Sequence, residues 1–215
     1  MLKTNILISI LSLTLLNSAA FAASSDFSTG DDSWRAAGDA DGPLSWQANG
    51  GNPGGHVSID DLTIGGVTFF IAPAKFLGNQ SAALGSNLTF DLQQIYSGSP
   101  SQFDDADVIL QGAGLTLVFD IGDHPANGAW TSYSVPLIAD GWRLNSLSGA
   151  AASDEQFIAV LSDLSALKIR AEYRTGPDIG LLDNVTLVPE PSTYGMLLIG
   201  LGAFAALGRR RRNQA

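Results

Sequence analysis

Histidine is the side chain best suited to acid–base chemistry near neutral pH, and this chain of 215 residues has only two, His56 and His124. His124 lies in the sequence GDHPANG with Asp120 and Asp123 close by, an arrangement that suggests a triad or a metal site. However, the chain has no Gly-x-Ser-x-Gly nucleophile motif, no His-x-x-x-His pair and no cysteine. We therefore interpret His124 as a solvated loop residue.

Paired carboxylates are another common catalytic arrangement, as in glycoside hydrolysis. Only two glutamates, Glu155 and Glu172, lie between residues 24 and 188. Aspartates are numerous, but no motif singles out a catalytic pair among them. We therefore predict that the protein is not an enzyme, and we keep a polysaccharide-active hydrolase as the weaker alternative.

Grouped aspartates can also bind calcium, which takes six to eight oxygen ligands in proteins. Three groups of aspartates are candidates, and for the two groups that contain three aspartates each, an acidic loop that faces water is the simpler interpretation. Asp183 is unusual because it shares strand parity with Leu181, on a face that we expect to be buried. The candidates are Asp26 with Asp31 and Asp32, Asp104 and Asp105 with Asp107, and Asp183.

A buried carboxylate needs a partner, because moving an unpaired charge out of water is costly. For Asp183 the partner would be a calcium ion, an arginine or main-chain N–H groups, unless a β-bulge turns the side chain outward. Asp26 and Asp183 are accordingly our candidate calcium ligands, although nothing in the sequence requires a cofactor.

Tryptophan offers a second kind of site, since an exposed indole ring can stack on a sugar ring. Packing on the edge of the core is the alternative for each tryptophan. We predict that Trp34 and Trp130 bind a sugar ligand, because small or polar residues flank both tryptophans in the sequence. All four tryptophans lie in loops or at the ends of expected elements: Trp34, Trp46, Trp130 and Trp142.

The N-terminus has the features of an export signal. Lys3 precedes residues 6–16, which are apolar apart from Ser and Thr, and Ala20-Phe21-Ala22 follows as a signal-peptidase site. We predict a signal peptide at residues 1–22, which signal peptidase removes. A permanent N-terminal anchor is the competing interpretation.

The C-terminus has the features of a membrane segment. Residues 194–208 contain no charge, and four arginines follow directly, at Arg209, Arg210, Arg211 and Arg212. With the arginine side chains reaching to the interface, such a stretch approaches the shortest helix that spans a bilayer. We predict a single transmembrane helix with its arginines on the cytoplasmic side.

This C-terminal segment, residues 189–215, resembles the PEP-CTERM sorting signal of Gram-negative bacteria. Its three parts stand in the family's order: Pro189-Glu190-Pro191, an apolar helix and an arginine cluster. The resemblance implies that an exosortase, a membrane cysteine transpeptidase, recognises Pro189, Glu190 and Pro191 and cuts near them. It also implies a protein that is first membrane-anchored and then reaches the cell surface or the extracellular matrix.

The region between these segments, residues 24–188, has the length of one domain. It carries twenty acidic and six basic side chains, a formal charge of −14. Such a surface repels phosphate backbones, so we predict no nucleic-acid partner. Because the chain has no cysteine, no disulfide bond supports this domain.

The domain has the pattern of an all-β protein with one short helix. Gly112-Ala113-Gly114 predicts a hairpin, and Pro136 indicates an edge strand or a bulge. Ser153 and Gln156 form a capping-box pattern at the start of the helix. Short runs separated by turn residues predict the strands of a β-sandwich, at residues 67–72, 87–96, 108–110, 115–119, 133–138, 167–173 and 180–188.

Several motifs occur along the domain: aromatic-x-Ala-Pro at 70–73, Phe-Leu-Gly-Asn at 76–79, Gly-x-x-Leu at 85–88, Asp-Val-x-Leu-x-Gly at 107–112, Trp130, Val160-Leu161 and Ile-Arg-Ala at 169–171. With these motifs, most of residues 26–188 resembles the laminin IV type A domain, also called laminin B. The resemblance implies a jelly-roll sandwich like those of carbohydrate-binding modules, and no catalysis. We therefore expect an exported surface or matrix protein that binds exopolysaccharide, or a purely structural matrix protein without a ligand.

Overall fold

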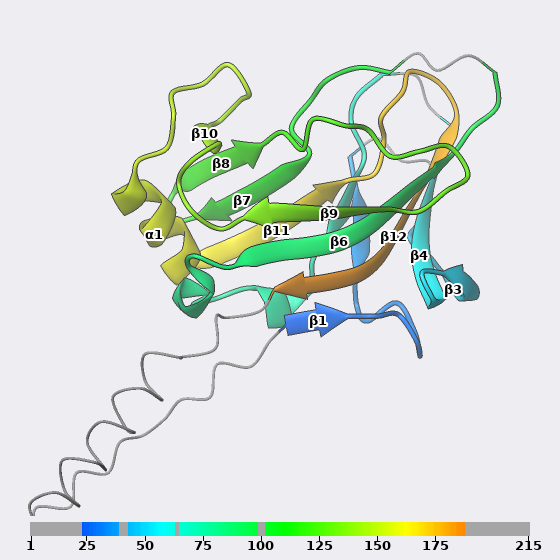
Figure 1. The fold of residues 1–215 in the computed structure, drawn as a ribbon, viewed down its shortest axis with the longest axis horizontal. Coiled ribbons are helices and arrows are strands. Elements are labelled where there is room, and N and C mark those ends of the chain that lie inside the picture. The colour runs from blue at the N-terminus through cyan, green and yellow to red at the C-terminus, as the bar shows by residue number, and fades with distance from the viewer. Residues whose placement is uncertain (1–22, 39–42, 63–64, 99–101, 188–215) are drawn as a thin grey trace, which may run out of the picture.

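The computed structural model describes residues 23–38, 43–62, 65–98 and 102–187, which form two antiparallel sheets packed face to face (Figure 1). Sheet A has the strand order β3-β4-β12-β6-β9, and β1 also pairs with β12. Its strands are β1 (Ala23–Ser25), β3 (Ser45–Gly51), β4 (Gly54–Asp61), β6 (Asn87–Ile95), β9 (Thr131–Pro136) and β12 (Asp178–Leu187).

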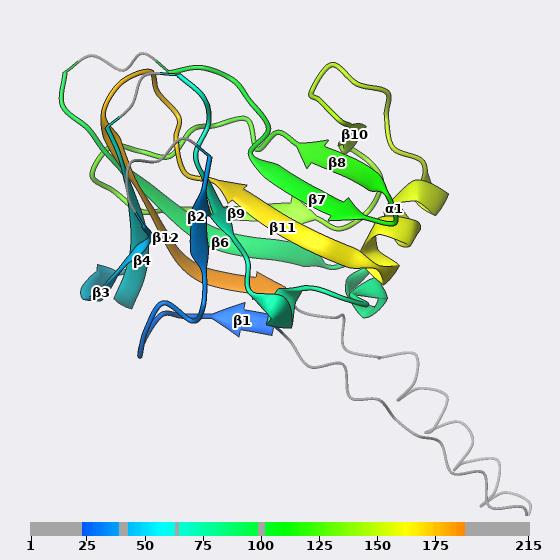
Figure 2. The same cartoon turned by 180° about the vertical axis from the view of Figure 1, so that it is seen from behind.

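Sheet B has the strand order β10-β8-β7-β11-β5-β2 and lies in front of sheet A when the molecule is seen from behind (Figure 2). Its strands are β2 (Arg35–Ala37), β5 (Phe69–Ile71), β7 (Val108–Gly112), β8 (Leu115–Phe119), β10 (Arg143–Leu144) and β11 (Leu164–Arg170). The helix α1 (Asp154–Ser162) and the short turns Ala74–Phe76 and Ser81–Ala83 complete the fold.

The core fills the space between the two sheets, and strand alternation explains which side chains enter it. On β6, Leu88, Phe90 and Leu92 are at most 1% exposed and belong to one apolar cluster. Their alternation with Thr89 and Asp91 confirms the face predicted for this strand, because successive residues of a strand point to opposite sides. The fold is thus an all-β sandwich with one helix, as the sequence predicts.

Three local predictions are confirmed. β7 and β8 form a hairpin through Ala113 and Gly114, both at positive φ. Pro136 ends β9, the edge strand of sheet A, where a missing N–H breaks no ladder. At the start of α1, Ser153 Oγ accepts the Gln156 N–H and the Gln156 side chain accepts the Ser153 N–H, which is a capping box.

One prediction about β11 is wrong. The alternating pattern over residues 167–173 predicts a strand buried on one face only, yet Arg170 and Glu172 on the other face are 0% and 1% exposed. The segment that precedes β7 covers Arg170, whose guanidinium donates to the carbonyl oxygen of Phe103 and forms an ion pair with Asp107. Arg170 enters the interior because carbonyl and carboxylate oxygens accept from its guanidinium, and Glu172 enters it because its carboxylate accepts the Thr68 N–H.

The two ends of the described domain lie side by side. Ala23 of β1 pairs with Leu187 of β12, so the chain enters and leaves the sandwich at the same end. The predicted signal peptide, residues 1–22, and the predicted sorting segment, residues 189–215, lie outside the described residues. Among the residues that the structure does describe, no helix is long and apolar enough to cross a membrane.

Candidate functional site

The candidate site lies on the outer face of sheet A, the face that points away from sheet B. Strand register defines this face, since the partners of an outward-facing residue also face outward. Asp91 of β6 pairs with Asp183 of β12 on one side and with Ser132 of β9 on the other. Further along, Gln93 pairs with Leu181, and Leu181 pairs with Ser58 of β4.

The hairpin between β3 and β4 folds over the carboxylates on this face. The Asn52 N–H donates to Asp183 Oδ2 over 2.6 Å, and the Asn184 N–H donates to Asp183 Oδ1 over 2.7 Å. Asp91 Oδ2 accepts from the side-chain amides of Asn52 at 3.1 Å and of Asn184 at 2.8 Å. Two carboxylates and two asparagines from three separate segments therefore form one hydrogen-bonded cluster.

Two of the arrangements expected for Asp183 occur together: a β-bulge turns its side chain outward, and main-chain N–H groups donate to its carboxylate. The ladder between β12 and β6 shifts register between Asp183 and Thr186, and Asn184 has a φ of 51°. This bulge reverses the parity of β12, so Asp183 faces outward while Val185 enters the core. Asp183 is nevertheless 0% exposed, because the hairpin covers it and supplies main-chain donors.

Small residues in the patch 49–55 let the hairpin approach this closely. A Cβ atom at Gly51 would lie 2.6 Å from Asp183 Oδ2, and it would also collide with the carbonyl oxygen of Gly55. A Cβ atom at Gly55 would collide with the carbonyl oxygen of Phe27. Only glycine fits both positions, so this patch of the sequence positions the cluster.

Trp130 crosses the outer face from the opposite edge of sheet A. It immediately precedes β9, yet its indole N–H donates to the Gly50 carbonyl oxygen over 3.0 Å, and its ring centroid lies 5.8 Å from that of His56. His56 belongs to β4, and β12 and β6 separate β4 from β9. Because three strand spacings amount to about 14 Å, the indole must lie over the two central strands.

Beyond Trp130, the same face opens into a shallow hollow of about 360 Å³. Ile95 and Ile179, which pair with each other, contribute apolar surface there, and Ile95 is 44% exposed. The hollow is lined by Asp60, Ile95, Tyr96, Ser97, Pro177, Asp178 and Ile179. The outer face therefore offers an aromatic ring, polar side chains and an apolar floor in succession along the strands.

Burial shifts the pKa values of two side chains on this face, Asp183 and His56. It raises the pKa of the Asp183 carboxyl, which the N–H donors of Asn52 and Asn184 oppose, and repulsion from Asp91 raises it further. Burial lowers the pKa of His56, so this imidazole is neutral at pH 7.

The tryptophan predictions have different outcomes. Trp130 is partly exposed on the outer face. Trp34 is only 2% exposed, so the expectation of an accessible ring at this position is wrong. Its ring packs edge-on against Phe76 at 5.4 Å, and its N–H donates to Ser25 Oγ at 2.8 Å, which satisfies the indole inside the core. Trp142 is also buried, whereas Trp46 is 37% exposed on β3.

Asp26 lies in an exposed turn after β1, outside the hydrogen-bonded cluster, although its charge contributes to the raised pKa of Asp183. Its Oδ1 atom accepts the Ser28 N–H at 3.1 Å, which lowers the pKa of the Asp26 carboxyl. Nearby, Asp32 forms an ion pair with Lys75. In the part of the chain that the structure describes, no three acidic or histidine side chains are placed to hold one metal ion, so calcium binding at Asp26 and Asp183 stays a prediction.

His124 does not behave as a solvated loop residue. Its side chain is 15% exposed, its ring lies 5.3 Å from that of Tyr173, and its Nε2 atom is 3.3 Å from Asp104 Oδ1. Asp123 contributes its carbonyl oxygen to the Tyr133 hydroxyl instead of contacting the imidazole. The contacts of His124 thus indicate packing at the end of the sandwich, without a triad.

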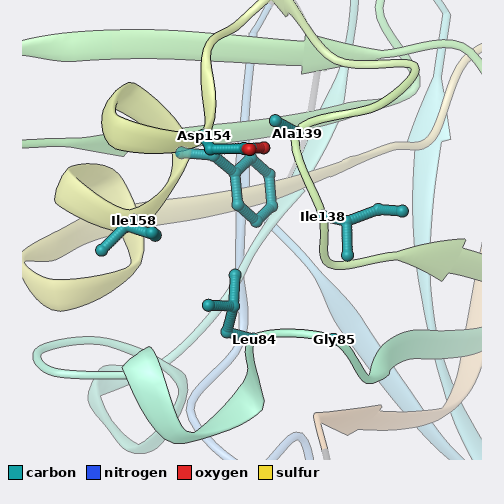
Figure 3. Close-up of a pocket in the computed structure, with 7 residues that line it drawn as sticks. Leu84, Gly85, Ile138, Ala139, Asp154 and Ile158 are labelled. Carbon is teal, nitrogen blue, oxygen red and sulfur yellow. The ribbon is translucent and has the colours of Figure 1, made fainter.

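A second hollow, of about 250 Å³, lies beside α1 at the other end of the sandwich (Figure 3). In Figure 3, Ile158 of α1 and Ile138, which follows β9, lie on opposite sides of Leu84. These three side chains are 44%, 44% and 41% exposed. Asp154 supplies the one charged side chain of the lining, so this hollow is a mainly apolar surface.

The sequence predicts Asp183 and Trp130 but not the residues that they meet. Asp91, Asn184 and Asn52 complete the carboxylate cluster. The Trp130 indole donates to the Gly50 carbonyl oxygen and contacts the His56 ring. The glycine-rich patch and the Asp-Asn pair at 183–184 are signals that could have indicated these partners. The predicted sorting residues Pro189, Glu190, Pro191 and Arg209–Arg212 lie outside the described residues.

Solved structures with the same fold come from two kinds of protein. The L4b domain of human laminin alpha-2 superposes with a TM-score of 0.51 and 15% identity, covering 60% of this chain and 78% of that one. The family 11 carbohydrate-binding module of cellulase Lic26A-Cel5E from Clostridium thermocellum has a TM-score of 0.51 and 16% identity, covering 80% and 96%. At such identities, these likenesses show the fold alone.

Sequence relatives include laminin chains that are much longer than the matched region. Human laminin subunit gamma-2 is 37% identical over 131 residues, which are 56% of this chain and 10% of that protein. Laminin subunit gamma-1 of Danio rerio is 28% identical over 182 residues, which are 76% of this chain and 10% of that protein. The chain therefore spans about a tenth of the length of these relatives.

Family models match two parts of the chain. The PEP-CTERM protein-sorting motif matches residues 187–212, which implies export, membrane anchoring before processing, and sorting by an exosortase. Laminin B (Domain IV) matches residues 69–190, more than half of the chain. The chain therefore belongs to the laminin B family and carries a PEP-CTERM sorting motif.

Proposed function

We propose that this protein binds exopolysaccharide at the bacterial cell surface or in the extracellular matrix, without cleaving it. The observation that carries the proposal is the position of Trp130, partly exposed across the outer face of sheet A. An aromatic ring that lies over a strand face provides an apolar platform on which a sugar ring can stack. The cluster of Asp91, Asp183 and the two asparagines holds the hairpin against which this indole rests.

The surface next to Trp130 has the mixture of polar and apolar groups that sugars require. Gln93 and Ser58 are partly exposed on the adjacent strands and can exchange hydrogen bonds with hydroxyl groups. Ile95 and Ile179 beyond them offer apolar contact to the C–H faces of a second sugar. Successive contacts along the strands suit a linear polymer more than a single small molecule.

The charge of the domain favours an uncharged or amine-bearing polysaccharide. Residues 24–188 carry a formal charge of −14, and a surface of this sign repels uronic-acid polymers. The family 11 module with a similar fold is, by its description, a carbohydrate-binding module of a cellulase. This likeness supports the proposal through the fold, and Trp130 supports it through chemistry.

The test uses affinity electrophoresis of the full chain in detergent, with gels that contain host exopolysaccharide or neutral, acidic and amino-sugar polymers. Trp130→Ala should weaken retention roughly five- to 150-fold, since one stacked ring is worth about 1–3 kcal/mol. Trp130→Phe should retain part of the affinity. Trp46→Ala is the matched control, because Trp46 is 37% exposed but donates its N–H to Phe27 at the sheet edge.

The same incubations also separate binding from catalysis and from a structural role. New reducing ends that accumulate with time would identify an enzyme. Equal retention of the Trp130→Ala and unsubstituted chains would contradict the assigned surface. Absence of retention on every polymer, together with no cleavage, would favour a structural matrix protein without a ligand.

A further inference from the structure

We propose that Leu84, Ile138 and Ile158 form a membrane-contact patch, which touches the lipid bilayer while the protein is still anchored by its C-terminal segment. The three side chains come from separate segments and surround one hollow (Figure 3). They are among the most exposed large apolar side chains that the structure describes. Apolar surface gathered in this way marks an interaction site more often than scattered single residues do.

The membrane-contact patch lies at the end of the sandwich where β12 leaves it. Leu187, the last residue of β12, pairs with Leu88 of β6. The ladder between β6 and β9 continues past this level, since the Leu137 N–H donates to Ser86 and the Gly85 N–H donates to Leu137. Gly85 lines the hollow and lies three residues, roughly 10 Å, beyond Leu88. In Figure 1 the arrowhead of β12 points toward the end that carries α1.

A short connection keeps this end close to the membrane. Seven steps of the chain separate Leu187 from Tyr194, where the uncharged stretch of the sorting motif begins. Fully extended, they reach at most about 25 Å. The opposite end of the sandwich, where β12 begins, lies roughly 30 Å further away along this ten-residue strand. Before the sorting cut, the end with the patch is therefore the end of the sandwich nearest to the bilayer.

Lipid is the occupant that the chemistry of the patch favours. Asp154 and Glu155 begin α1, and exposed Asp140 follows Ala139, so this end carries negative charge and no patch-lining cation. Electrostatic attraction to anionic headgroups is therefore disfavoured. The mode of membrane contact that fits this end is insertion of its apolar side chains into a zwitterionic interface. Three side chains bind weakly by themselves, but the anchor raises their effective concentration at the membrane.

The test places one fluorescent label on the full chain, which has no natural cysteine to compete for it. Ile158→Cys carries an environment-sensitive NBD label in the membrane-contact patch. Ser97→Cys carries the same label at the opposite end, in the exposed segment after β6. Both proteins, made without the sorting enzyme, are reconstituted by their anchors into phosphatidylcholine vesicles, with and without a lipid-borne quencher.

We expect the label at position 158 to shift to the blue and to be quenched, while the label at position 97 stays solvent-like. Adding Leu84→Ser and Ile138→Ser should reduce quenching at position 158 to the level of the control label. Vesicles that contain phosphatidylglycerol should reduce it too, because of the acidic side chains nearby. Melting curves of each labelled protein verify that the sandwich stays folded.

Three outcomes would overturn the proposal. One is a label at position 158 that stays as solvent-exposed as the label at position 97. Another is quenching at position 158 only when the vesicles also contain the sorting enzyme, which would assign the patch to a protein partner. The third is failure of the full chain to float with the vesicles, since the patch could then not be held at a membrane.

Discussion

The main-chain N–H of Asn52 donates to the Asp183 carboxylate over 2.6 Å, although 131 residues separate the two in sequence. This hydrogen bond fastens the β3–β4 hairpin across the outer face of sheet A. The same hairpin presents the carbonyl oxygen of Gly50 to the indole of Trp130. The buried carboxylate thus holds the platform that we propose for polysaccharide binding.

Asp183→Asn should lower the free energy of unfolding by about 1.5–3 kcal/mol. Both of its carboxylate oxygens accept a main-chain N–H, so the NH2 group of asparagine would face one of these donors and leave it buried without an acceptor. Thermal unfolding monitored by circular dichroism measures the change. Asp60→Asn, at an exposed position of the same sheet, should leave the melting temperature almost unchanged. Equal stability of the two variants would contradict the role of Asp183.

Calcium binding at Asp26 and Asp183 is tested with the same variants. A ligand that binds only the folded state raises stability by RT ln(1 + [L]/Kd), so bound calcium should raise the melting temperature. Asp183→Asn should abolish that increment. Identical curves in millimolar calcium and in chelator would mean that main-chain donors alone satisfy this carboxylate.

Asp178 should make stability fall as the pH rises from about 4 to about 7. Burial, followed by repulsion from Asp61, raises the pKa of Asp178 to about 7 from 3.8, against the effects of Arg174 and Arg170. Below about pH 4 the Asp178 carboxyl is protonated in both the folded and the unfolded state, so it does not reduce the stability. Above that, only the unfolded chain ionises freely, and each unit of pKa difference amounts to about 1.4 kcal/mol.

Asp178→Asn should remove this pH dependence and make the protein more stable than the unsubstituted chain at pH 8. The amide oxygen of asparagine can still accept the hydrogen bond that Gln94 donates to Asp178 Oδ2 at 2.9 Å. Urea unfolding at pH 4, 6 and 8 gives the comparison, with Asp60→Asn as the exposed control. If Asp178→Asn lowered the stability by the same amount at all three pH values, relative to the unsubstituted chain, the result would contradict the raised pKa of Asp178.

Arg170→Met should destabilise the domain by about 3–5 kcal/mol, because it leaves the carboxylate of Asp107 buried without its cation. The guanidinium also lies 4.5 Å from the ring centres of Phe103 and Tyr173. Combining Arg170→Met with Asp107→Asn should recover part of the loss. Lys168→Met on the same strand is the control, and a similar effect there would indicate a general sensitivity of β11.

Processing of the sorting motif should remove the residues beyond about Pro191 in a host with an exosortase. Replacing Pro189 and Pro191 with alanine should leave the chain uncut, since two prolines hold the extended backbone that a protease grips. Intact-mass measurement of the exported protein checks this. A native product that retains Arg209–Arg212 would contradict it.

The sequence by itself determined the class of the fold and the identity of its two parts. Alternation of Leu88, Phe90 and Leu92 predicts a strand buried on one face, and capping by Ser153 places the helix, because both depend on neighbouring residues alone. The sorting motif is equally local, since its proline pair, apolar run and arginines are contiguous.

Only the tertiary structure decided which side chains meet. Trp34 and Trp130 have similar flanking residues, yet the first is buried against Phe76 and the second crosses sheet A to Gly50. Asp183 faces outward because a bulge shifts its register, and it is covered because a distant hairpin folds over it. Burial and long-range hydrogen bonds depend on strand order and register, which bring together residues that no local pattern connects.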